Sequence, residues 1–180
     1  MTGRSTLATR LARFWADESA TATVEFVIVF PVVMTIFASA YEIGLANVRH
    51  VMLERATDVV VRELRLGTGA DLTYEDMKTR LCEVALIIPA CDTALKLELV
   101  PVSTASWDWP EVRADCVDRA AAVNPVREWE NGIQNELMMV RACIVVDPLF
   151  PAFGLGATLP KDETGGYRLV ATSGFVNEPL

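Results

Sequence analysis

Few residues of this chain have types and spacings that could perform catalysis. The one histidine, His50, follows Arg49 at the end of a long apolar run, where we expect an interfacial residue rather than a general base. Ser-His-Asp and Cys-His sites both need such a base. No C-x-x-C pair occurs, and Gly154 and Gly156 lie in a proline-bounded segment rather than in a phosphate-binding loop. The sequence therefore predicts a protein that is not an enzyme, with no cofactor and no metal site.

The cysteines are better explained by structure than by chemistry. There are four, all after the apolar run: Cys82, Cys91, Cys116 and Cys143. An even number in an exported domain is typical of disulfides, and four cysteines allow three pairings. We favour Cys82 with Cys91, since the turn at Pro89 separates them, and then Cys116 with Cys143 by elimination; the other pairings stay open.

Composition excludes several function classes. The chain has 180 residues, 52% of them hydrophobic, and a formal net charge of -8, which suits one modest domain with an appendage. Sixteen Lys and Arg against 24 Asp and Glu leave no positive excess for phosphates, so no nucleic acid is expected as a partner. The carboxylates between residues 108 and 118 lack the spacing of a calcium loop, and we expect a solvated surface from Asp108, Glu111, Asp115 and Asp118.

One segment could cross a membrane. Between Glu25 and Glu42 the chain has no charged residue, and residues 26–41 are almost entirely apolar. About 20 helical residues are needed to cross about 30 Å of hydrocarbon, so the predicted span is extended to about residues 25–48 and ends before Arg49.

Charge also predicts the orientation of this span. Arg4, Arg10 and Arg13 precede it, which favours a cytoplasmic N-terminus and places the rest of the chain outside the cytoplasm. A carboxylate in the middle of a span costs about 2.5–3.5 kcal/mol, so Glu42 is expected close to the far interface. Glu25 lies where the free amide groups and the dipole of a helix start favour a negative charge.

Apolar periodicity predicts two helices. Leu53, Ala56 and Val60 continue the helical pattern beyond the membrane, so residues 21–66 are predicted to form one long helix. Thr73 and Asp76 have capping-box spacing, which predicts a second helix that continues until Pro89 stops it.

Alternation predicts a short antiparallel sheet after these helices. Leu95, Leu97 and Leu99 alternate with Lys96 and Glu98, as expected for a half-buried strand. Residues 137–146 and 167–176 are predicted as two further strands, residues 103–132 have no clear period, and residues 148–160 are predicted to be a Pro/Gly-rich connector. The expected fold is α+β: a long transmembrane and amphipathic N-terminal helix followed by a small extracytoplasmic head over residues 67–180.

The start of the predicted long helix carries a distinctive motif. Residues 19–26 read SATATVEF, and they are followed by an apolar segment with Pro31 and by YEIG at residues 41–44. This arrangement resembles the N-terminal region of TadE-like proteins, the minor pseudopilins of Tad (Flp-type, type IVc) pilus systems. The end of the chain, VNEP at residues 176–179, also resembles the end of many members.

The resemblance implies a pilin-like fold, a function and a set of site residues. Residues 1–20 would be a cytoplasmic leader that a prepilin peptidase removes after Ala20, where the family mostly has Gly, so that Thr21 becomes the first residue. Glu25 is then the fifth mature residue, followed by the aromatic Phe26, and would meet the new N-terminal amine of a neighbouring subunit as a registry signal. The implied partners are prepilin peptidase, other pilins or pseudopilins, and the Tad inner-membrane assembly proteins. The implied location is the bacterial inner membrane with a periplasmic head, or the extracellular pilus, with a role in surface adhesion.

An alternative without polymerisation stays open. Ala38-Ser39-Ala40 matches the A-x-A pattern of signal peptidase I, which would release residues 41–180 as a soluble periplasmic protein. An uncleaved chain would instead be a membrane-anchored periplasmic binding domain. Ala40 and Gly44 form a small-xxx-small pair that could let two membrane helices approach closely.

Overall fold

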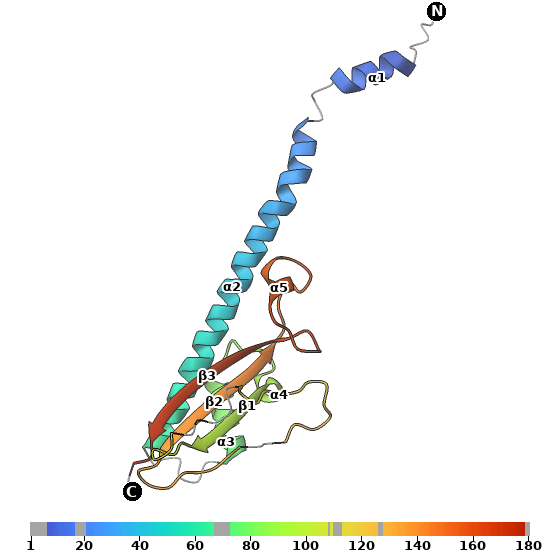
Figure 1. The fold of residues 1–180 in the computed structure, drawn as a ribbon. Helices are drawn as coiled ribbons and strands as arrows, with labels where there is room; N and C mark the ends of the chain where they lie inside the picture. The colour runs from blue at the N-terminus through green and yellow to red at the C-terminus, as the bar shows by residue number, and fades with distance from the viewer. Residues whose placement is uncertain are drawn as a thin grey trace, which may run out of the picture.

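A computed structural model describes residues 7–16, 21–66, 73–107, 109, 113–125 and 128–178. The predicted α+β fold is confirmed: a long apolar N-terminal helix leads into a small head with a three-stranded antiparallel sheet that packs on it, as Figure 1 shows. The elements, in chain order, are α1 (Leu7–Ala16), α2 (Thr21–Arg65), α3 (Tyr74–Val84), α4 (Cys91–Ala94), β1 (Leu95–Pro101), β2 (Leu137–Val146), α5 (Gly154–Thr158) and β3 (Tyr167–Val176).

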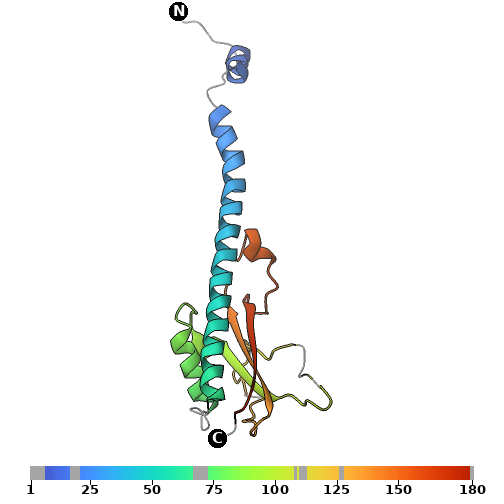
Figure 2. The ribbon, with the colours of Figure 1, turned by 90° about the vertical axis from the view of Figure 1, so that its left-hand side faces the viewer.

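Helix α2 has two halves with different surroundings. It is a single helix of 45 residues, about 68 Å long at about 1.5 Å per residue, and its bounds agree with the predicted residues 21–66. Every described side chain from residue 22 to residue 37 is exposed, whereas Leu53, Ala56 and Val60 in the second half are fully buried. The second half therefore forms one wall of the core, and the first half extends beyond the head (Figure 2).

The sheet has the order β1-β2-β3, with both pairs antiparallel. Helices α2 and α3 cover one face, α2 against β2 and β3 and α3 against β1. On that face Leu97, Met138 and Ile144 pack with Leu53 and Leu81 in the main hydrophobic core.

Helix α3 begins where its capping box predicts. The Thr73 hydroxyl accepts from the Asp76 amide at 3.3 Å, and the Asp76 carboxylate accepts from the Thr73 amide at 3.1 Å, which satisfies two free N–H groups of the first turn. The helix ends at Val84, earlier than the predicted stop before Pro89. A tight turn follows, and Ala90, in the left-handed region at φ 50°, precedes the short helix α4.

Two other expectations about the head are wrong. Strand β1 is buried on both faces rather than half-buried, because residues 113–116 cover the face that carries Lys96 and Glu98. The predicted connector at residues 148–160 contains helix α5, which packs against α2 rather than against the sheet.

Candidate functional site

The N-terminal half of α2 is the largest exposed apolar surface among the described residues. By length and composition α2 could cross a membrane. Two hydroxyl groups just after Pro31 bond to the helix itself: Thr35 Oγ1 donates to the Pro31 carbonyl at 2.7 Å, and Ser39 Oγ donates to the Thr35 carbonyl at 2.8 Å. The polar groups that follow Pro31 are thus satisfied inside the helix, as a membrane environment requires.

The residues expected at the processing and registry sites lie at the start of this surface. Ala20 lies outside the described residues, and Thr21 is the first residue of α2. Glu25 is exposed one turn later, and Phe26 is exposed and stacks on Phe30 with ring centroids 4.9 Å apart. Glu25 therefore projects from a bare helix, with its carboxylate open to a partner.

Glu42 has a different environment from Glu25. Its side chain is 0% exposed, and its carboxylate accepts from the backbone amides of Leu149, at 2.9 and 3.1 Å, and Phe150, at 3.0 Å. The sequence predicted only that Glu42 lies close to the far interface of the membrane. Its partners lie in a segment more than 100 residues away in the chain, so no local pattern could have identified them.

Ser39 extends the same contact by one helical turn. Its hydroxyl accepts from the Leu155 amide at 3.1 Å, at helix α5. Gly154 lies so close that a Cβ there would come within 2.6 Å of Ser39 Oγ, and its φ of +63° also suits glycine. We call residues 148–160 the α5 loop; Ser39 and Glu42 fasten it to α2.

Ala40 and Gly44 lie on a different face of α2. Both are exposed, and within the described part of the structure no atom lies within 4 Å of the position that a Gly44 side chain would occupy. The small-residue pair is therefore accessible to a second helix, and its role in helix packing stays a prediction.

Two disulfides fasten the head. Cys82 is bonded to Cys91, with Cα atoms 5.7 Å apart, and Cys116 is bonded to Cys143, with Cα atoms 5.2 Å apart. This is the pairing that the sequence favours. The first joins the end of α3 to α4, and the second joins the irregular segment around residue 116 to β2.

Charged side chains lie buried where that irregular segment covers the sheet. Lys96 Nζ is 2.7 Å from Asp115 Oδ2, and the cross-strand partners Glu98 and Arg141 form an ion pair. Asp115 was expected on a solvated surface; it is instead part of this buried cluster. Asp118 forms hydrogen bonds within its own loop, and Asp108 and Glu111 lie outside the described residues. The four charges of the buried cluster are paired, Lys96 with Asp115 and Glu98 with Arg141, which is typical of structural ion pairs.

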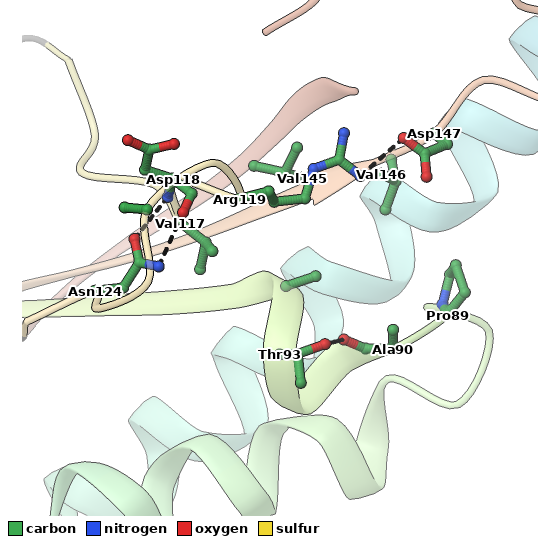
Figure 3. Close-up of a pocket in the computed structure, with 12 residues that line it drawn as sticks. Pro89, Ala90, Thr93, Val117, Asp118, Arg119, Asn124, Val145, Val146 and Asp147 are labelled. Carbon is green, nitrogen blue, oxygen red and sulfur yellow. Dashed lines mark hydrogen bonds and ion pairs between the residues drawn. The ribbon is translucent and has the colours of Figure 1, made fainter. Parts of the chain in front are cut away.

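Figure 3 shows a pocket of about 370 Å³ at the end of β2, beside α4. Several of its polar groups bond to one another: Arg119 Nη1 lies 2.8 Å from Asp147 Oδ1, and Asn124 pairs with the backbone of Asp118. Burial lowers the pKa of Arg119, but its ion pairs with Asp147 and Asp162 outweigh burial and leave the pKa raised. Among the described residues that line the pocket none is His or Cys, so its lining offers no nucleophile paired with a base.

His50 has a structural contact. Its Nε2 lies 3.1 Å from the Val170 carbonyl and 3.7 Å from Glu54. In the part of the chain that the structure describes, no three His, Cys, Asp or Glu side chains are grouped closely enough to hold a metal ion.

The comparison with known families matches the segment that holds the exposed apolar helix and the carboxylate in its first turns. Residues 20–62 match the family model for TadE-like protein. The resemblance identified from the sequence is confirmed over this segment, which begins at Ala20 and contains Glu25, Glu42 and most of α2. TadE-like proteins are a structural family rather than an enzymatic one, and the match suggests a component of a Tad pilus system. No curated protein and no solved structure matches the chain significantly.

Proposed function

We propose that this chain is a minor pseudopilin of a Tad pilus, in which α2 is both the membrane anchor and the assembly element. The observation that carries the proposal is the TadE-like match over residues 20–62, because it coincides with the exposed half of α2 and with Glu25. The candidate membrane helix and the disulfide-bonded head are consistent with an anchored protein whose head lies outside the cytoplasm.

In this proposal a prepilin peptidase removes residues 1–20, which creates an α-ammonium at Thr21. Glu25 lies four residues further along the helix and is exposed, so it can pair with the amine of a neighbouring subunit. Such a pair offsets the cost of a carboxylate in an apolar environment and sets the register between subunits. The other proposed partners are pilins or pseudopilins and the Tad inner-membrane assembly proteins.

Release by signal peptidase after Ala40 is the competing model. It would separate Ser39 from the α5 loop, although the Ser39 hydroxyl accepts from the Leu155 amide at 3.1 Å. It would also divide the helix that the family match spans. Both observations count against cleavage after Ala40.

N-terminal sequencing of the mature chain tests the proposal. The full chain, produced together with a prepilin peptidase, should begin at Thr21. A start at Met1 would indicate a plain anchor, and a start at Tyr41 would indicate a secreted domain. Either of these two results would refute the proposal. A20G should be cleaved at least as well, because the family mostly has Gly there, whereas A20F should stay uncleaved. Cleavage that proceeds equally in A20F would show that the junction lies elsewhere.

A further inference from the structure

The α5 loop has the composition of a membrane segment although it belongs to the head. Between Asp147 and Lys161 the chain has no charged residue, and it includes Leu149, Phe150 and Phe153. Leu149 is 51% exposed and Phe153 is 45% exposed. Large apolar side chains exposed together indicate a surface that meets a partner or a membrane.

The loop lies beside the part of α2 that is predicted to span the membrane. It contacts α2 at Ser39 and Glu42, and Figure 2 shows α5 next to the middle of α2, beyond the end of the sheet toward the N-terminus. At about 1.5 Å per residue, Ser39 lies about 21 Å and Glu42 about 26 Å from Glu25 along the helix. With Glu25 at the cytoplasmic face, both lie within the outer part of a hydrocarbon layer about 30 Å thick.

Three backbone amides of the loop are bonded to side chains of α2, which favours its placement at this depth. Glu42 accepts from the amides of Leu149 and Phe150, and Ser39 accepts from the amide of Leu155. Non-helical backbone at membrane depth is tolerated only where it is buried in protein or lines a water-filled cavity, and these bonds hold the loop's backbone against α2. Burial of the Glu42 carboxylate would be costly without partners, and the Leu149 and Phe150 amides provide them.

Around the α5 loop, aromatic residues and charged residues lie at different depths along α2. The ring of Phe150 lies 6.5 Å from that of Tyr41 and 5.3 Å from that of Phe153. Of these three aromatic residues, Tyr41 is of the type that is enriched at membrane interfaces. The charged groups begin where the loop ends: Arg49 Nη1 donates to the Asp147 carbonyl, and Arg119 pairs with Asp147. This boundary coincides with the predicted end of the span at residue 48.

We propose that the α5 loop lies in the outer leaflet of the membrane beside α2, as a second lipid-contacting element that fixes how deep the head sits. The occupant of its exposed apolar surface is lipid, because the surface is continuous with the exposed half of α2 and no residue from 148 to 160 is charged. The ammonium of Lys161, the residue after the loop, is bonded to the Pro151 carbonyl at 2.9 Å. The inference depends on the anchoring role of α2 but not on pilus assembly.

Photocrosslinking of the full chain in phosphatidylethanolamine and phosphatidylglycerol nanodiscs tests it. p-Benzoylphenylalanine at position 153 or 149 should give mass adducts with lipid, and the same group at Ile133, an exposed residue before the far end of β2, should give none. The same probe at Val33, on the bare half of α2, reports whether the helix itself contacts lipid.

The outcomes separate the two proposals. Adducts at Val33 without adducts at 149 or 153 would overturn the loop's membrane contact and leave anchoring intact. Absence of adducts at Val33 would overturn anchoring and with it the loop inference. Crosslinks from position 153 to a second copy of the chain, in place of lipid, would show that the surface is a subunit interface.

Discussion

The carboxylate of Glu42 accepts the backbone amide of Leu149 at 2.9 Å, which joins the middle of the N-terminal helix to a loop 107 residues further along the chain. The predicted membrane span, residues 25–48, thus contains two carboxylates with opposite environments. Glu25 is exposed on bare helix, whereas Glu42 is buried under the α5 loop. This difference allows their roles to be separated by mutation.

Replacing Glu42 should release the loop, and replacing Glu25 should not. Hydrogen bonds to a charged group contribute about 1.5–3 kcal/mol, so Glu42→Ala should speed hydrogen exchange of the Leu149 and Phe150 amides about 10- to 100-fold. The matched variant Glu25→Ala should leave these amides protected and reduce piliation instead. Unchanged exchange in Glu42→Ala would show that the loop is held by other contacts, and wild-type piliation in Glu25→Ala would remove the registry role.

Gly154 offers an independent test of the same contact. Gly154 and Gly165 both have positive φ, at +63° and +91°, so alanine strains the backbone at either position. Only at Gly154 would the new Cβ meet α2, within 2.6 Å of Ser39 Oγ, whereas nothing lies within 4 Å of it at Gly165. Gly154→Ala should therefore expose the Leu155 amide to exchange, and Gly165→Ala should not. Equal effects would indicate backbone strain rather than lost docking.

Local and periodic signals predicted most of the fold. The apolar period of α2, the capping box at Thr73 and the alternation in β2 and β3 each depend on neighbouring residues, and each agrees with the structure. Helices α4 and α5 have four and five residues, too short for a helical period to be recognised.

The errors in the candidate sites have a different cause. Lys96 and Asp115 each resemble a solvated residue in the sequence, but they pair with one another across 19 positions, with Lys96 buried and Asp115 partly buried. The docking role of Glu42 likewise depends on Leu149 and Phe150. Contacts between distant residues leave no local pattern, so only the tertiary structure reveals them.

Removing one partner of the buried ion pair between Glu98 and Arg141 should destabilise the head more than removing the charge of both partners. Glu98 is 3% exposed and Arg141 7%, and Glu98 Oε1 also accepts from the Asp115 amide at 2.6 Å. Arg141→Met leaves a buried carboxylate without its cation and should lower the free energy of unfolding by about 3–5 kcal/mol. Adding Glu98→Gln should restore most of that loss, because the uncharged amide oxygen can still accept from Asp115. Urea denaturation of the full chain in mild detergent measures both; a double variant no more stable than Arg141→Met would contradict the argument.

Asp162 should make the head sensitive to acid. Burial raises the pKa of Asp162, but hydrogen bonds from the Thr164 hydroxyl, the Gly166 amide and Arg119 outweigh burial and leave the pKa below its ordinary value. A carboxylate whose pKa is lowered by folding contributes stability above its unfolded pKa of about 3.9, and that stability is lost as the pH falls through the folded pKa. Asp162→Asn should therefore be less stable than the wild type at pH 7, and the difference between their urea midpoints should shrink steadily below about pH 4.

Glu163 supplies the control for this acid effect. It is the neighbouring carboxylate and its side chain is exposed, so Glu163→Gln removes the same formal charge from the loop without removing the acceptor for Thr164, Gly166 and Arg119. Its urea midpoint should follow that of the wild type from pH 7 down to pH 3. A midpoint difference for Asp162→Asn that stays constant over this range would mean that the side chain stabilises the loop by packing alone, since only a contribution from the ionised carboxylate disappears when the group is protonated.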